Sequence, residues 1–175
     1  MIFLKLLGKL IKALSSNASP AQLAWGFAIG AFLGLMPVNT LFTVFILFIL
    51  LIFNVNIASA MLAFALYGIV AWMLDPLFHS TGFWMLASLP FLKTTWTALF
   101  NAPIAPLTRF NNTIVMGSFV AAIVLITPNY ILFRGFVIRY RESWNEEIKK
   151  WRITQMLKGS KLVKLIVKAR SLAGR

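Results

Sequence analysis

Residues 13–133 carry only three fully charged side chains, Asp75, Lys93 and Arg109. A water-soluble domain needs far more polar surface than such a segment can supply. The whole chain agrees, because 60% of its 175 residues are hydrophobic, 12% are charged, and the mean hydropathy is +0.84. We therefore expect an all-α membrane protein, since helices satisfy their own backbone hydrogen bonds in lipid.

Positive charge gathers at both ends of the chain. Residues 1–12 carry three lysines, and residues 134–175 hold twelve Lys or Arg against three Glu. Basic flanks around an apolar centre follow the positive-inside rule, so we expect both termini to be cytoplasmic. Nucleic-acid binding needs a basic patch on a folded soluble surface, and we expect no nucleic-acid partner.

The two basic ends are predicted to form amphipathic helices. In residues 1–15, one side of a helix would carry Lys5, Lys9 and Lys12, which suits the headgroup region; a plain topogenic flank is the alternative. Residues 136–175 predict a basic cytoplasmic helical tail, in which a second such helix carries Lys161, Lys164 and Lys168. Anionic lipid at the cytoplasmic face is the expected partner of these lysines, and a soluble protein surface is the alternative for the tail.

The centre, residues 19–135, is predicted to be a membrane domain. Ser19, Pro20 and Gln22 form a good helix start, with a capping residue followed by proline and a capping-box glutamine. Four helices are expected, over residues 20–36, 40–53, 57–74 and 112–133. The first would reach about 25 Å, which is marginal against a hydrocarbon core of roughly 30 Å.

Glycines recur every fourth residue in the first of these helices, at Gly26, Gly30 and Gly34. In lipid, small residues at this spacing let another backbone approach closely. We expect the partner to be the next segment, folded back after Pro37 into a short glycine-rich helical hairpin that spans fully or is re-entrant. Its helix breaks are expected to be structural, at Pro37, Asn54 and Asn56. The alternative is that the Pro37–Asn39 turn lines a polar path.

The stretch SPAQLAWGFAIGAFLGLMPVNTLFTVFILFILLIFNVN resembles a prokaryotic integral-membrane family catalogued as domain of unknown function 2062. The shared features are a pattern G-x-A-x-G-x-F-x-G-x-x-P and a later asparagine, here Gly26, Ala28, Gly30, Phe32, Gly34, Pro37 and Asn56. The resemblance covers residues 15–135 and implies a small bacterial inner (cytoplasmic) membrane protein without an agreed activity or catalytic residues. The chain departs from the pattern at Asn39, where glycine is usual, and at Asp75-Pro76, where Asn-Pro is common.

Asp75 stands immediately before Pro76, at the end of the third predicted helix. This order predicts that Asp75 caps a new helix. A proton relay with His79, four residues on, is the alternative. Residues 76–110 are aromatic but interrupted by prolines, which indicates an interfacial or re-entrant segment, and we expect Trp84 and Trp96 to contact lipid or a protein partner on the outer face.

Catalysis has little support in the sequence. Four acidic residues, one histidine and no cysteine leave no paired carboxylates, metal cluster or nucleophile–base pattern, so we expect no enzyme activity, cofactor or metal. Two functions remain: an accessory or scaffold subunit of a cell-envelope assembly, including a lipid-related one, or a small transporter or channel with a pathway at Pro37 and Asn54–Asn56. A polar cavity that reaches Asn39 or Asn54 would favour transport, and a closed bundle would favour the accessory role.

Overall fold

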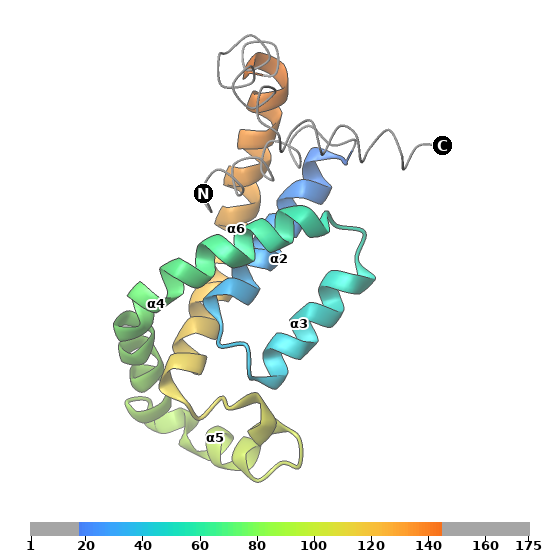
Figure 1. Cartoon of the computed structure of the whole chain (residues 1–175). Helices are drawn as coiled ribbons and strands as arrows, with labels where there is room; N and C mark the ends of the chain where they lie inside the picture. Colours follow the sequence, from blue (N-terminus) through green and yellow to red (C-terminus); the bar gives the residue numbers. More distant parts are fainter. Residues whose placement is uncertain (1–17, 145–175) are drawn as a thin grey trace, which may run out of the picture. The chain divides into compact units, whose positions relative to one another are not determined.

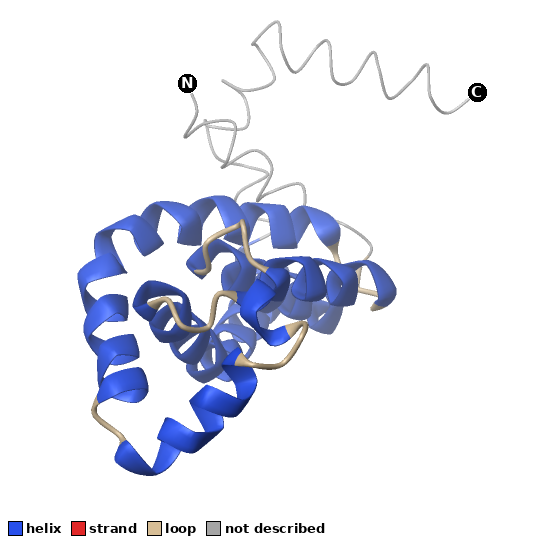
Figure 2. Cartoon of the chain, turned by 90° about the horizontal axis from the view of Figure 1, so that it is seen from below, coloured by secondary structure: helices blue, strands red, loops and turns tan. Residues whose placement is uncertain are grey.

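The computed structural model describes residues 18–144, and within that range it contains helices and connecting turns but no strand (Figures 1 and 2). The chain divides into two compact units, residues 1–137 and 138–175, and the helical bundle belongs to the first. The elements in chain order are α2 (Pro20–Leu35), α3 (Leu41–Ile52), α4 (Ile57–Ala87), η1 (Pro90–Leu92), α5 (Lys93–Phe100), η2 (Ala105–Thr108), α6 (Thr113–Arg139) and the π-helical turn η3 (Tyr140–Trp144). The all-helical prediction is confirmed for this part of the chain. The basic helices predicted for residues 1–15 and for the tail beyond residue 144 lie outside it.

Helix α2 begins as its sequence predicts. The Gln22 backbone N–H donates to Ser19 Oγ over 3.1 Å, and the Ser19 N–H donates to Gln22 Oε1 over 2.8 Å. This reciprocal capping box satisfies backbone donors that the first turn leaves free. Pro20 follows at the first helical position, where a backbone N–H would have no partner within the helix, so the N–H that proline lacks is not missed. Most of the helix after this first turn is buried, so α2 is the core of the bundle.

The glycine stripe of α2 packs against α4, and the prediction that it packs against α3 is wrong. A Cβ built on Gly30 would lie 2.6 Å from the carbonyl carbon of Ala60, and one on Gly34 would lie 2.7 Å from the carbonyl oxygen of Phe64. Gly26 faces the backbone of Asn56 in the same way. The two backbones are therefore in direct contact at three successive positions along one face of α2.

Side-chain size explains why α4 and not α3 takes this place. Helix α3, with the sequence LFTVFILFILLI, contains no glycine, alanine or serine at which a second backbone could approach. The first turn of helix α4 contains Ala58, Ser59 and Ala60, and the Ser59 hydroxyl donates to the carbonyl oxygen of Leu23 over 2.7 Å. Van der Waals packing between closely approaching helices and hydrogen bonds between them drive helix association in lipid. The larger side chains of α3 leave it at the edge of the bundle, where only Leu50 is buried.

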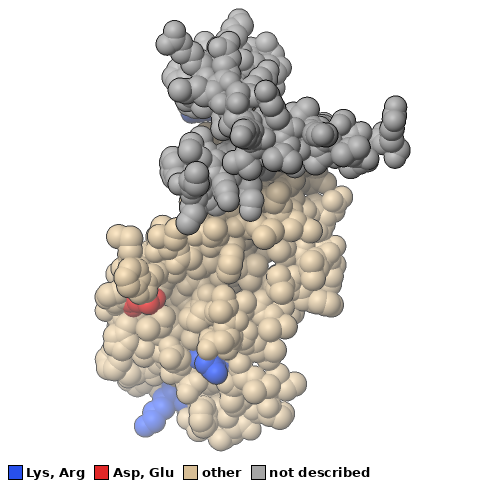
Figure 3. All heavy atoms as spheres, viewed as in Figure 1, with Lys and Arg blue, Asp and Glu red and all other residues tan. Residues whose placement is uncertain are grey.

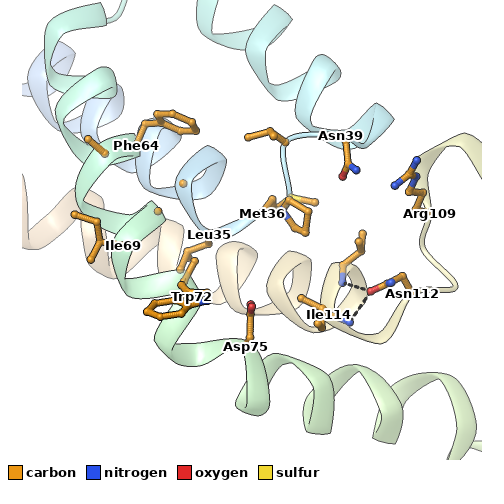
Figure 4. Close-up of a pocket in the computed structure, with 17 residues that line it drawn as sticks. Leu35, Met36, Asn39, Phe64, Ile69, Trp72, Asp75, Arg109, Asn112 and Ile114 are labelled. Atoms are coloured by element: carbon orange, nitrogen blue, oxygen red, sulfur yellow. Dashed lines mark hydrogen bonds between the residues drawn. The ribbon is translucent and has the colours of Figure 1, made fainter.

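Helix α4 runs on through Asp75 and Pro76 to Ala87, so the predicted end at residue 74 and the predicted N-cap role of Asp75 are both wrong. The helix instead changes direction near Asp75 (Figures 1 and 4). A proline inside a helix removes one hydrogen bond and kinks the backbone. The Ser80 hydroxyl donates to the Pro76 carbonyl over 2.9 Å, a bond to the preceding turn that itself favours a bend.

A second glycine contact fixes the far half of α4 against the start of α6. A Cβ on Gly82 would lie 2.7 Å from the carbonyl carbon of Thr113, and one on Gly117 would lie 2.6 Å from that of Phe78. Gly82 on α4 lies against the backbone of α6, and Gly117 on α6 lies against the backbone of α4, so the two helices approach closely. This contact explains why residues 76–87 continue as helix, because they bury a face against α6.

The segment after α4 lies at the surface of the bundle. None of η1, α5 and η2 contains a buried residue, which does not support the alternative of a re-entrant element inside the bundle. Two helices, α4 and α6, are long and apolar enough to cross a membrane, whereas α2 and α3 are shorter apolar helices.

Candidate functional site

A cavity of about 700 Å³ lies beside the turn that joins α2 to α3 (Figure 4). The turn forms because Pro37 cannot continue α2, while Met36 stays buried and anchors it to the core. The hydroxyl of Thr43 donates to the Pro37 carbonyl over 2.8 Å, and Thr40 caps α3 through the Thr43 N–H. These bonds leave the Asn39 side chain exposed at the cavity.

The middle of α4 forms a second wall, which is apolar for most of its length. Phe64, Ile69 and Trp72 lie along it, and Asp75 follows at the bend. Trp72 is 81% exposed and Ile69 is 63% exposed, so this wall continues onto the outer surface of the bundle. Asp75 is partly buried, and its carboxylate points toward the cavity (Figure 4).

The third wall comes from Arg109, Asn112 and the first turn of α6. Arg109 has a φ of 55°, the left-handed region that side chains other than glycine rarely adopt. Hydrogen bonds from its N–H to the Pro106 carbonyl (2.9 Å) and from the Asn112 N–H to its own carbonyl (2.9 Å) hold this conformation. Asn112 Oδ1 accepts from the N–H groups of Ile114 and Val115 and so caps α6.

The predicted site residues divide between this cavity and the opposite end of α2. Gly34, Pro37 and Asp75 line the cavity. Asn56 caps α4 through the Ser59 N–H (2.8 Å), and its own N–H donates to the Gln22 carbonyl (3.1 Å) in the first turn of α2. Asn54 is exposed in the same connection. The two helix breaks therefore do not line one cavity.

Asp75 and His79 are not brought together as a pair. His79 Nδ1 lies 2.7 Å from the Thr113 hydroxyl, in the contact between α4 and α6. Among residues 18–144, no group of three or more His, Asp or Glu side chains could hold a metal ion.

The two predicted contact tryptophans differ in their surroundings. Trp84 is 58% exposed. Trp96 donates through its indole Nε1–H to the Met85 carbonyl over 3.2 Å and packs against Phe110, so it ties α5 to α4. It also lines a smaller cavity of about 310 Å³ together with Lys93. The lysines predicted to contact lipid at both ends lie outside the described residues.

Sequence reasoning missed four residues that organise the bundle. Gly82 and Gly117 form the second glycine contact, and the spacing of Thr113, Gly117 and Ala121 repeats the signal already seen in α2. Tyr67 donates through its hydroxyl to Asn129 Oδ1 across the bundle. The sequence feature that could have indicated this bond is Asn129 itself, an isolated amide beside Pro128 in a long apolar run.

Comparison with known proteins places this arrangement among bacterial proteins. A family model described as "Uncharacterized protein conserved in bacteria" (domain of unknown function 2062) matches residues 5–145. A protein from Treponema pallidum (strain Nichols), called "Uncharacterized protein", is 33% identical over 138 residues, which cover 79% of this chain and 85% of the relative. No solved structure matches the chain. The family match includes the whole bundle and every wall of the cavity.

Proposed function

The chain belongs to the bacterial family catalogued as domain of unknown function 2062, and from this premise we propose that it is a multi-pass protein of the inner membrane that serves as an accessory or scaffold subunit of a cell-envelope assembly. It performs no catalysis of its own. Both termini are cytoplasmic, where their lysines contact anionic lipid, and the segment after the bend of α4 meets a protein partner on the outer face.

The outer surface of the bundle supports a location in the membrane. On the face shown in Figure 3, the described residues are almost entirely uncharged. Large apolar side chains are more than half exposed on three helices: Val44, Phe45, Phe48, Leu51 and Ile52 on α3, Met61, Ile69, Trp72 and Met73 on α4, and Val124, Ile131 and Leu132 on α6. Soluble monomers rarely expose such large apolar patches, whereas a bilayer accommodates them.

Helix lengths fit an even number of membrane crossings. The 31 residues of α4 extend about 46 Å in total, and the 27 residues of α6 extend about 40 Å, more than a hydrocarbon core of roughly 30 Å. The 16 residues of α2 and 12 of α3 reach only about 24 Å and 18 Å. They form a short or re-entrant pair, so the count is four crossings, or two plus a re-entrant hairpin. Either count returns the chain to its starting side.

One observation carries the accessory role: every buried polar side chain of the described bundle already has a hydrogen-bond partner. Thr40, Ser59, Ser118 and Asn129 are the buried polar residues of the described chain, and the side chain of each has a partner within it. No buried side-chain nitrogen or oxygen in that part of the chain lacks a partner. A polar solute crossing a membrane needs groups that replace its water, and here they are already used.

Transport remains the second candidate, because the cavity reaches Asn39. A pathway would have to continue from Asn39 to the far break at Asn54–Asn56. Asn56 lies instead beside the first turn of α2, at the other end of that helix from Asn39. Between the two ends, the glycine contact brings the backbones of α2 and α4 together and leaves no room for a pathway. This geometry favours a cavity that ends inside the bundle over a pathway through it.

Flux and crosslinking separate the two functions. Proteoliposomes that contain the purified protein alone should pass potassium ions and small neutral solutes no faster than empty liposomes. Flux above that background that is abolished by Asn39→Leu would establish transport and overturn the accessory role.

A photo-crosslinking residue at Trp84 should capture a defined protein in cells, since this side chain is exposed beyond the bend of α4. The control is the same residue at Met61, which is 63% exposed on the first half of α4 and should capture only lipid. Equal protein capture at both positions, or none at Trp84, would contradict the proposed partner surface.

A further inference from the structure

Two side chains of opposite charge face one cavity, and neither forms an ion pair or a hydrogen bond within the described part of the bundle. Asp75 and Arg109 both line the cavity of about 700 Å³. Within residues 18–144, no hydrogen bond or ion pair engages either side chain. Ionisable groups that face a cavity in a membrane protein are candidates for a functional site. The cavity is also of the size that small-molecule sites have.

The backbone holds Arg109, which follows η2, in an unusual conformation. A left-handed conformation costs a residue other than glycine roughly 1–2 kcal/mol. Yet arginine stands there, held by the Pro106 and Asn112 hydrogen bonds. Because strain of this kind persists where the surroundings impose it and clusters at binding sites, the conformation supports a role for the guanidinium.

Amide groups complete the polar half of the cavity. Asn39 is exposed at the turn after Pro37, and Figure 4 shows it on the same side as Arg109. Asn112 accepts with its carbonyl oxygen from the start of α6, which leaves its NH₂ as a donor. Two amides beside a guanidinium suit an anion such as a phosphate.

The other half of the cavity is apolar and open to the outer surface. Phe64, Ile69 and Trp72 line it, and all three are also exposed on α4. A ligand with an apolar tail can therefore place its headgroup among the polar residues and its tail along α4. A small polar solute would leave this apolar wall without a partner.

We propose that this cavity binds the headgroup of a phospholipid that carries both a phosphate and a primary ammonium group. Arg109 binds the phosphate, Asp75 accepts hydrogen bonds from the ammonium, and an acyl chain lies along Ile69 and Trp72. This inference rests on the membrane location proposed above and adds a specific lipid to it.

Lipid binding by the full-length protein in detergent tests the proposal, with native mass spectrometry as the readout. Phosphatidylethanolamine should bind more tightly than phosphatidylglycerol, which has the phosphate but no ammonium. Asp75→Asn and Arg109→Gln should each weaken phosphatidylethanolamine binding by about tenfold or more, as expected for hydrogen bonds to charged groups. Arg109→Lys should retain part of the affinity. Lys93→Gln is the matched control, since Lys93 does not line this cavity, and it should bind as the wild type does.

Four results would overturn the proposal. Equal binding of the two lipids, or an Asp75→Asn variant that folds and binds as the wild type does, would show that the ammonium is not recognised. Free phosphoethanolamine that competes as well as the lipid would make the ligand a soluble one. If Asp75→Asn does not fold, the comparison of Arg109→Gln with Arg109→Lys and Lys93→Gln decides alone, and equal binding by all three refutes the site.

The membrane location is judged by a separate measurement. A protein that fractionates with membranes but shows no lipid preference refutes only the lipid site. A protein found in the soluble fraction refutes the location as well.

Discussion

Replacing Gly30 with alanine tests the contact between α2 and α4 at its closest point. The added Cβ would lie 2.6 Å from the Ala60 carbonyl carbon, whereas ordinary contact begins at 3.4 Å. Because the obstacle is backbone and cannot rotate away, the helices must separate. The Ser59 hydroxyl, now 2.7 Å from the Leu23 carbonyl, would then lie about 3.5 Å away, where little of a hydrogen bond remains.

The expected cost can be estimated from these two effects. Overpacking costs about 1–3 kcal/mol, and an interhelical hydrogen bond in a membrane protein contributes about 0.6 kcal/mol. Alanine recovers about 0.5–1 kcal/mol of helix propensity. The net destabilisation of Gly30→Ala is therefore about 1–3 kcal/mol, and the larger side chain of Gly30→Leu should prevent folding.

Two other glycines provide matched controls on the neighbouring helices. A Cβ on Gly135 would have no atom within 4 Å, and one on Gly68 would lie 3.9 Å from the Gly34 carbonyl oxygen. Gly135→Ala and Gly68→Ala should therefore be neutral or stabilising by up to about 1 kcal/mol. Thermal unfolding of the detergent-solubilised variants provides the comparison. If Gly30→Ala unfolds at the same temperature as the two controls, the argument from backbone contact is refuted.

Two further predictions follow from particular contacts, and a third follows from the positive charge at both ends of the chain. Asn56→Ala should destabilise the protein by about 1 kcal/mol through loss of the α4 cap, whereas Asn54→Ala, at an exposed position, should be neutral; equal melting temperatures would refute the cap. Arg109→Gly should unfold at a higher temperature than Arg109→Ala, because glycine adopts a φ of 55° without strain, and the reverse order would contradict the left-handed conformation. Reporter proteins fused before Met1 and after Arg175 should both be active in the cytoplasm; activity on opposite sides would require an odd number of crossings.

The helices of this fold follow from local sequence, and their partners do not. Ser19, Pro20 and Gln22 predict the start of α2 to the residue, because capping depends only on neighbours in the chain. The glycine stripe predicts that some backbone approaches closely, but it does not name which one. Helix α4 rather than α3 packs against the stripe because α4 has small residues, Ala58, Ser59 and Ala60, on its side of the contact.

Asp75 shows where a local rule failed. An aspartate before a proline is a favourable helix start, yet this one lies at a bend within α4 because Gly82 and Gly117 hold the following turns against α6. Tertiary contact thus decided between a cap and a kink. The cavity could not be predicted for the same reason, since Asn39, Asp75 and Arg109 come from three distant parts of the chain.

Side-specific labelling of single cysteines is the most direct test of the membrane bundle, because the natural chain contains no cysteine. Asn54 and Thr94 are both exposed, one before α4 and the other in α5 after it. In spheroplasts, which lack the outer membrane but keep a sealed inner membrane, a membrane-impermeant maleimide should label Thr94→Cys at once. It should label Asn54→Cys only after the spheroplasts are lysed. Labelling of both positions from the same side would contradict a membrane crossing between them, and with it the proposed bundle.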